Sequence, residues 1–155
     1  MKSWLGAAAM AAGVALSGSA YAADYYFASA SKAGWFFVDL EKVETIDDGV
    51  RSAWTLMIHD TTEERGSAYV RTEGLFACEK KLYFPQKFYD YRLDGKVRDY
   101  GRYSSRWNKV GPGSVLETQM ELVCAKTPNP ELRLGDVAPL ALTQRLREKA
   151  AAKKP

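Results

Sequence analysis

The fold is decided by the stretch 111-GPGSVLETQMELVC-124, which predicts a helix that ends in a cysteine. Ser114 and Glu117 form a Ser-x-x-Glu capping box, in which side-chain oxygens satisfy backbone amides that the first helical turn leaves unpaired. Three apolar side chains recur at helical spacing and predict one buried face: Leu116, Met120 and Val123. Cys124 lies on this face, so the helix should present its cysteine to the structure that it packs against.

The chain before this helix consists of β-strand patterns joined by short polar turns. Residues 34–40 are aromatic and β-branched, as strands prefer, and residues 50–60 alternate apolar and polar side chains. Trp54 lies on the apolar phase of this second run, so we expect it to face the core as a structural residue. His59 lies on the polar phase, so we expect it on the solvated surface.

A hairpin is predicted at Asp94-Gly95, because glycine tolerates the positive φ that a two-residue turn requires. The flanking strands are predicted over 82–92 and 97–105. Pro85 has no backbone N–H to donate, so it indicates an edge position or a break in the first of these strands. Successive strands joined in this way predict an antiparallel meander.

The N-terminal residues predict export. Lys2 precedes an apolar run, 4–16, and small residues follow up to Ala22, which is the arrangement of a secretory signal peptide. We expect cleavage after Ala22 and a periplasmic or secreted mature chain, 23–155. The apolar run is too short to span a bilayer, and no cysteine near the cleavage point could accept a lipid, so we expect no anchor in the mature chain.

The two cysteines are predicted to form a structural disulfide. The alternating run 68–79 directs Cys78 into the core, and Gly74 within it indicates a bulge or a close backbone approach. Cys78 and Cys124 are the only cysteines, and such a pair usually joins in an oxidising compartment. A metal site would need further ligands, and a redox-active pair is more often spaced C-x-x-C.

Four segments follow from these patterns: a signal peptide over 1–22, a leader over 23–33, a main domain over 34–126, and a connector, short helix and basic tail over 127–155. Leu142 and Leu146 lie on one side of the last helix, predicted for 136–152. The fold class is α+β: an antiparallel β-meander of five to six strands packed against a disulfide-linked helix, with a short C-terminal helix.

Several motifs occur together in this order: a Val-x-x-x-Trp-Thr-Leu strand that contains Trp54, Cys78 at a strand end, a Tyr/Asp/Gly hairpin, Arg106-Trp107-x-x-Val110-x-Pro112-x-Ser114, and a helix that ends in Val123-Cys124. The chain resembles the bacterial surface-adhesin protein E family over Trp35 to Cys124. The resemblance implies an antiparallel sheet tied to a helix by the cysteine pair. It also implies a non-enzymatic module, whose named member is a lipid-anchored outer-membrane adhesin for host matrix proteins. The present chain lacks that member's lipidated cysteine.

Catalytic and metal-binding residues form no recognisable pattern. His59 is the only histidine, Ser67, Ser104 and Ser114 lack a G-x-S-x-G setting, and adjacent acids in turns indicate solvated charge. We therefore expect no enzyme, no cofactor and no metal site. The alternatives are a periplasmic enzyme acting on cell-wall glycan, with two acids from distant strands, and a purely structural envelope protein.

Tyrosine and arginine gather in the basic segment after Cys78. Six of these side chains are candidate binding residues: Tyr89, Tyr91, Arg98, Tyr100, Arg102 and Trp107. Rigid rings supply contact area and guanidinium groups pair with carboxylate or phosphate, so the set is typical of protein interfaces and of acidic ligands. The alternative is that the rings half-cover the core while the cations reach solvent.

Charge divides the mature chain into an acidic and a basic half, with net −5 over 24–78 and net +5 over 79–109. The division predicts either a homodimer that joins unlike halves or internal complementarity between neighbouring strands. We predict an exported, non-catalytic binding module of the bacterial cell envelope. Its partner is expected to be a protein or an acidic glycan such as lipopolysaccharide, and export argues against nucleic acid.

Overall fold

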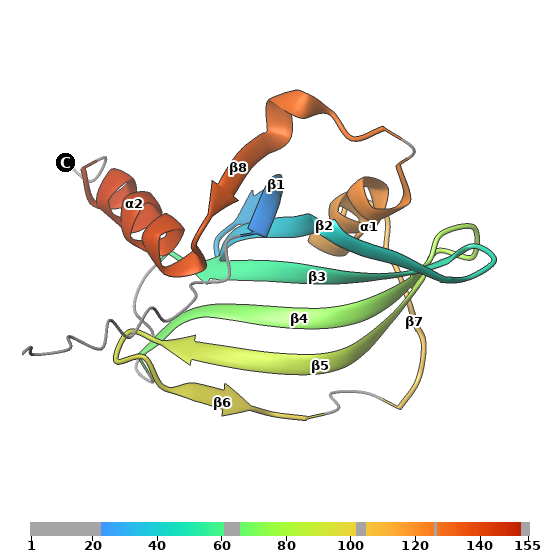
Figure 1. Ribbon diagram of the computed structural model, residues 1–155, viewed down its shortest axis with the longest axis horizontal. Coiled ribbons are helices and arrows are strands. Elements are labelled where there is room, and N and C mark those ends of the chain that lie inside the picture. The colour runs from blue at the N-terminus through green and yellow to red at the C-terminus, as the bar shows by residue number, and fades with distance from the viewer. Residues whose placement is uncertain (1–22, 61–65, 102–104, 126, 153–155) are drawn as a thin grey trace, which may run out of the picture.

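The computed structural model describes residues 23–60, 66–101, 105–125 and 127–152 (Figure 1). The predicted signal peptide, Arg102 and Ser104 of the candidate residues, and the last residues of the basic tail lie outside the described residues. The described chain forms one antiparallel sheet of eight strands and two α-helices. The α+β class and the antiparallel meander are therefore confirmed.

Six consecutive strands lie side by side in chain order. They are β1 (Ala23–Ser31), β2 (Gly34–Asp47), β3 (Val50–His59), β4 (Ser67–Ala77), β5 (Leu82–Arg92) and β6 (Val97–Asp99). The strand β8 (Arg133–Val137) returns to pair with β1, and the short β7 (Asn108–Lys109) pairs with β5. The predicted hairpin at Asp94-Gly95 joins β5 to β6.

The sheet has more strands than the five to six predicted, because segments outside the predicted main domain join it. Residues 23–31 form β1 instead of a leader, and Ala23 and Tyr25 within it are fully buried. Residues 133–137 form β8 instead of a connector, after a short 3-10 helix, Pro130–Leu132. The polar sequence of β8 has little intrinsic strand preference, and it takes its conformation by pairing with β1.

The two helices pack against opposite faces of the sheet, near opposite ends of the strands (Figure 1). Successive residues of a strand point to opposite faces. Val38 packs in the apolar cluster beneath α1 (Val115–Cys124), whereas its neighbour Phe37 packs in the cluster beneath α2 (Pro139–Ala151). We call these two sides of the sheet the α1 face and the α2 face.

Strand β3 is buried on both faces, which corrects the expectation of a half-buried strand. Ala53 is fully buried beneath α1, and Leu56 is fully buried on the α2 face. His59 is only 9% exposed, so its predicted place on the solvated surface is wrong. Trp54, expected in the core, is half-buried. Helix α2, on the other side of the sheet from α1, covers Leu56 and explains why β3 is buried on both faces.

The predicted disulfide is present and ties α1 to the sheet. Cys78 follows the end of β4 and is bonded to Cys124, the last residue of α1, at an S–S distance of 2.03 Å. Arg51 of β3 reinforces the same junction, because its guanidinium donates to the carbonyl oxygen of Val123 at 2.7 Å. This contact satisfies a carbonyl that the helix end leaves without a helical partner.

The capping box at the start of α1 is confirmed in a slightly altered form. The Oγ of Ser114 accepts a hydrogen bond from the Glu117 backbone N–H at 3.1 Å. The Oε2 of Glu117 accepts from the backbone N–H of Gly113, at 2.7 Å, instead of from that of the cap residue. Both side chains still satisfy amides at the helix start.

Gly74 and Pro85 lie opposite each other at an irregularity between β4 and β5. The register shifts beside Gly74, and Gln86 is the extra residue on β5. The predicted bulge is therefore confirmed, and the group that approaches Gly74 closely is the ring of Tyr83, with which a Cβ atom would collide, instead of another backbone. Strand β5 continues through Pro85, which lies between the segments that pair with β7 and with β6 and so has no described partner strand on its outer side, in agreement with the predicted edge position.

Helix α2 begins later than predicted, because Asp136 and Val137 belong to β8. Leu142 and Leu146 pack on the apolar cluster of the α2 face, as their spacing predicts. Arg147 fixes the helix to the strand ends: its Nε donates to the His59 carbonyl oxygen at 3.1 Å, and its Nη2 donates to that of Ser67 at 3.2 Å.

Candidate functional site

Tyr89 and Tyr91, two of the candidate binding residues, lie on the α2 face of β5. Tyr89 is the cross-strand partner of Arg71 on β4, and Tyr91 is the partner of Tyr69. Arg71 in turn pairs with Leu56 of β3, whose side chain packs in the cluster beneath α2. Cross-strand partners share a face, so these tyrosines continue the surface that α2 covers further along.

Arg98 and Tyr100 lie on the opposite face, so the structure divides the candidate set. Arg98 pairs with Asp90, the residue between the two tyrosines of β5, and therefore points away from them. The ring of Tyr100 contacts that of Phe88 with 5.3 Å between centroids. Arg102 lies outside the described residues.

Trp107 also lies on the α2 face, towards the other end of β5. Its ring packs against Phe84 with 5.6 Å between centroids, and 41% of the residue is exposed. Phe84 pairs with Leu75, whose side chain is on the same face of β4 as Arg71. Trp107 is thus a partly exposed packing residue, separated along the strand from Tyr89.

Two stacked ring pairs and one guanidinium form a continuous surface on β3, β4 and β5. Trp54 stacks on Tyr89 with 6.0 Å between ring centroids, and Tyr69 stacks on Tyr91 with 4.6 Å. The guanidinium of Arg71 lies 4.8 Å from the centroid of the Trp54 ring. We call this surface the aromatic face; its members are Trp54, Tyr69, Arg71, Tyr89 and Tyr91. The four rings are half-buried, so each also presents area to solvent.

The sequence-based set missed three members of the aromatic face. Tyr69 and Arg71 belong to the polar phase of the run 68–79, so the alternation already directed them away from Cys78. Their proximity to Tyr89 and Tyr91 depends on the register between β4 and β5, which contains a bulge. Trp54 was assigned only to the core, because a single strand pattern does not show where a covering helix ends.

Beneath the aromatic face lies a buried ion pair. Asp39 of β2 is fully buried, and its Oδ2 is 3.9 Å from the Nη2 of Arg71, which is 9% exposed. Burial raises the pKa of Asp39, and the positive charges of Lys42 and Arg71 oppose that rise. Burial also raises the pKa of Tyr69 to about 12, so its hydroxyl stays protonated at neutral pH.

A shallow hollow of about 450 Å³ borders the aromatic face at Tyr89. Six of the described residues line it: Glu73, Gln86, Lys87, Tyr89, Asp99 and Gly101. The ammonium of Lys87 is 2.6 Å from the Oε2 of Glu73, and this hydrogen-bonded pairing raises the pKa of Lys87. The Oδ1 of Asp99 accepts from the backbone N–H of Gly101 at 2.7 Å. The side chains of Glu73, Lys87 and Asp99 are therefore held in place by one another or by the backbone.

A comparison with protein families shows to which family the chain belongs. The sequence model for the family described as surface-adhesin protein E matches residues 26–125. The chain belongs to the surface-adhesin protein E family.

Three solved structures of Haemophilus influenzae protein E are similar to this family member at low identity. Crystal form II has 12% identity and a TM-score of 0.46, and the match covers 57% of this chain and 79% of that one. A second structure has 10% identity, a TM-score of 0.46 and coverage of 65% and 83%. Protein E from a non-typeable strain has 11% identity, a TM-score of 0.44 and coverage of 77% and 88%. No curated protein matches the sequence.

The match to surface-adhesin protein E ends at residue 125, so β8 and α2 lie beyond it. In this family member, the segment after the match extends one edge of the sheet and covers part of the α2 face. Within the described ranges, neither α-helix has the length and apolar character needed to cross a membrane. The aromatic face consists entirely of residues inside the matched region.

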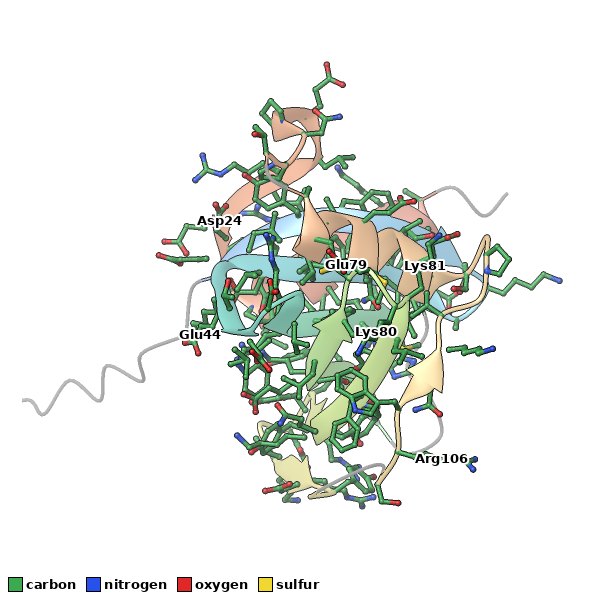
Figure 2. The ribbon with its side chains drawn as sticks, turned by 90° about the vertical axis from the view of Figure 1, so that its right-hand side faces the viewer. Asp24, Glu44, Glu79, Lys80, Lys81 and Arg106 are labelled. Atoms are coloured by element: carbon green, nitrogen blue, oxygen red, sulfur yellow. A yellow bond between two sulfur atoms is a disulfide. The ribbon has the colours of Figure 1, made fainter. Side chains whose placement is uncertain are left out.

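Charge is distributed across this surface-adhesin protein E member from edge to edge. Figure 2 shows Asp24 and Glu44 on one side of the molecule and Lys81 and Arg106 on the other. The separation follows from the strand order, because the acidic half of the sequence includes β1 and β2, and the basic half includes β5, β6 and β7. The ion pair between Glu73 and Lys87 joins the two halves at the border between β4 and β5.

Proposed function

We propose that this member of the surface-adhesin protein E family is an exported, non-catalytic binding module of the cell envelope that engages a protein through the aromatic face. One observation carries the proposal: the stacked pairs Trp54–Tyr89 and Tyr69–Tyr91 surround a guanidinium on a sheet face that α2 covers only in part. Trp, Tyr and Arg are the residues that dominate binding energy at protein interfaces.

The geometry of the rings suits recognition. Stacking holds each ring in one orientation, so little side-chain freedom remains to be lost when a partner binds. The rings are half-buried, and therefore offer apolar area while their other sides pack on the domain. Arg71 lies close to the Trp54 ring and to the carboxylate of Asp39, whose charge attracts its guanidinium. A partner would meet a largely pre-organised surface.

Catalysis has little support from the polar groups of the hollow. The carboxylate of Glu73 is engaged in an ion pair, with 2.6 Å between its Oε2 and the Lys87 ammonium. Hydrolysis of a glycan requires a protonated carboxyl group as general acid. We therefore favour binding over the alternative of a periplasmic enzyme acting on cell-wall glycan, and over a purely structural role, which would not require half-exposed rings.

An acidic glycan such as lipopolysaccharide is a second candidate partner, favoured by the exposed cations at the β5–β6 edge. Lys96 and Arg98 are exposed on β6 and the turn before it, and Tyr100 beside them is 49% exposed. These residues are on the other side of β5 from the aromatic face, so the two partners would use different surfaces. A homodimer that brings the acidic edge to the basic edge remains part of the proposal, supported by their opposite positions (Figure 2).

The location is tested by protease treatment of intact cells, with a periplasmic protein as control. The proposal includes a signal peptide over residues 1–22, cleaved after Ala22. Loss of the protein from intact cells supports a surface adhesin. Protection until the outer membrane is opened supports a periplasmic binding module instead, and retention in the cytoplasm contradicts both.

The binding surface is tested with purified mature protein against immobilised extracellular-matrix proteins and purified lipopolysaccharide. Tyr91→Ala should abolish matrix-protein binding, whereas Tyr100→Ala, on the opposite face of the same edge, should leave it intact. Loss of lipopolysaccharide binding in Arg98→Glu alone would support the second candidate. Equal binding by wild type, Tyr91→Ala and Arg98→Glu would contradict both surfaces.

A further inference from the structure

We propose that the hollow beside Tyr89 is a binding site for a neutral saccharide. The inference rests on the proposed binding function and names a ligand class for one part of that surface. The hollow of about 450 Å³ lies within the range of roughly 300–1,000 Å³ that small-molecule sites occupy. It forms at the irregularity of β5, where the extra residue Gln86 separates the segment near β7 from the segment that pairs with β6.

Tyr89 supplies the apolar wall of this site. The face of an aromatic ring carries partial negative charge, and the C–H groups on one side of a pyranose ring carry partial positive charge, so the two faces attract each other. Trp54 stacks on Tyr89 with an interplanar angle of 28°, which fixes the orientation of the ring. A sugar could therefore lie against Tyr89 without ordering a flexible side chain.

The remaining side chains supply hydrogen bonds of both kinds. The amide of Gln86 can donate and accept, the ammonium of Lys87 donates, and the carboxylates of Glu73 and Asp99 accept. Sugar hydroxyls both donate and accept, so this mixture can satisfy several of them at once. Lys87 is held by Glu73 and Asp99 by the Gly101 backbone, which limits the ordering cost of binding.

The charge of the lining selects neutral over acidic sugars. Of the described residues that line the hollow, Glu73 and Asp99 each carry a negative charge and Lys87 carries a positive one. A uronate or phosphorylated sugar would add a further negative charge beside two carboxylates, and like charges at short range repel. The hollow thus differs from the basic sequence segment that surrounds it, because Glu73 enters from β4.

The test is a titration of purified mature protein with three trisaccharides: chitotriose, cellotriose and tri-galacturonate. Nuclear magnetic resonance shifts of the backbone amides report where each one binds. We expect at least one neutral trisaccharide to bind at roughly millimolar concentration, with shifts at residues 86–89, and tri-galacturonate to bind at least tenfold more weakly. Tyr89→Ala should weaken neutral binding by roughly tenfold, whereas Tyr89→Phe, which keeps the ring, should retain most of it.

Tyr100→Ala is the matched control, because it removes a tyrosine from the opposite face of the same sheet edge. The inference is overturned if neither neutral trisaccharide binds, if tri-galacturonate binds as tightly, or if Tyr89→Ala binds like wild type. Matrix-protein binding that depends on Tyr91 would then still support the proposed function. Saccharide binding without any matrix-protein binding would support the hollow and contradict the protein partner.

Discussion

The two faces of the sheet differ in how they are covered. The α1 face is covered by a helix that is bonded covalently to the end of β4, and an apolar cluster that includes Val38, Phe76 and Val123 is buried beneath it. The α2 face is covered by a helix held through Arg147 and two leucines, and beyond that helix it presents half-buried rings beside a buried guanidinium, and a hollow. The contrast fits the proposal that the α1 face mainly stabilises the fold and that the α2 face is the recognition surface.

The test with the largest expected effect on stability removes the disulfide. Cys124→Ala should lower the free energy of unfolding by up to about 4 kcal/mol, because the bond closes a long loop and limits the unfolded chain. Chemical denaturation of oxidised and fully reduced protein measures the effect. The variant and the wild type should have the same stability when both are reduced, and an equal loss in both conditions would contradict the assignment to the disulfide.

Arg147→Ala should have the next largest effect, about 2–3 kcal/mol, because it leaves strand-end carbonyls of His59 and Ser67 without their charged donor. The measurement is urea denaturation of the folded domain. Arg145→Ala is the control, because Arg145 is an exposed residue of the same helix. Both variants replace arginine by alanine, so they change the intrinsic helix propensity by the same amount. Similar losses in both variants would show that Arg147 does not hold α2 to the sheet.

The buried Asp39 predicts a pH dependence of stability. Its pKa in the folded protein lies above its ordinary value of 3.8, so the folded state binds the proton more tightly than the unfolded state. Protonation therefore favours folding, and the stabilising contribution is lost as pH rises from the unfolded pKa through the folded pKa. Each unit of elevation corresponds to about 1.4 kcal/mol.

Asp39→Asn removes this titration while it keeps the shape of the side chain. The free energy of unfolding of wild type minus that of Asp39→Asn should fall as pH rises from about 4 and then level off. Urea denaturation at a series of pH values measures the difference. A difference that rises with pH would mean that Arg71 outweighs burial and that the pKa of Asp39 is lowered.

Ser114→Ala should cost about 1 kcal/mol, because it removes the oxygen that accepts from the Glu117 amide at the start of α1. Ser114→Asp should recover most of the loss, since aspartate also caps helices. Thermal denaturation followed by circular dichroism distinguishes the two variants. Equal destabilisation by both would indicate that the hydroxyl has another role.

Tyr91→Ala should have the smallest effect on stability, about 1 kcal/mol or less, because its ring is half-buried and stacks on one neighbour, Tyr69. Its effect on partner binding should be much larger. Urea denaturation and binding measurements on the same variant compare its loss of stability with its loss of partner binding. A stability loss near that of Cys124→Ala would show that the aromatic face is part of the core, and the contrast between the two faces would fail.

Much of the α1 side could be predicted from the sequence because its signals are local. The capping box of Ser114, the helical spacing that places Cys124 inward and the hairpin at Asp94-Gly95 each depend on a few neighbouring residues. The aromatic face could be predicted only in part. Tyr89 and Tyr91 were predicted as binding residues, whereas Arg98 and Tyr100 were grouped with them because a list of tyrosines and arginines does not show which face each residue takes.

The sequence by itself determined the alternation of the strands, the start and end of α1 and the pairing of the two cysteines, because short-range geometry and the presence of only two thiols fix these features. Tertiary structure alone decided that 23–31 and 133–137 join the sheet, that β3 is buried on both faces, and that Trp54 and Arg71 meet Tyr89. These features depend on register and packing between segments far apart in the chain, where no local pattern of side chains carries the information.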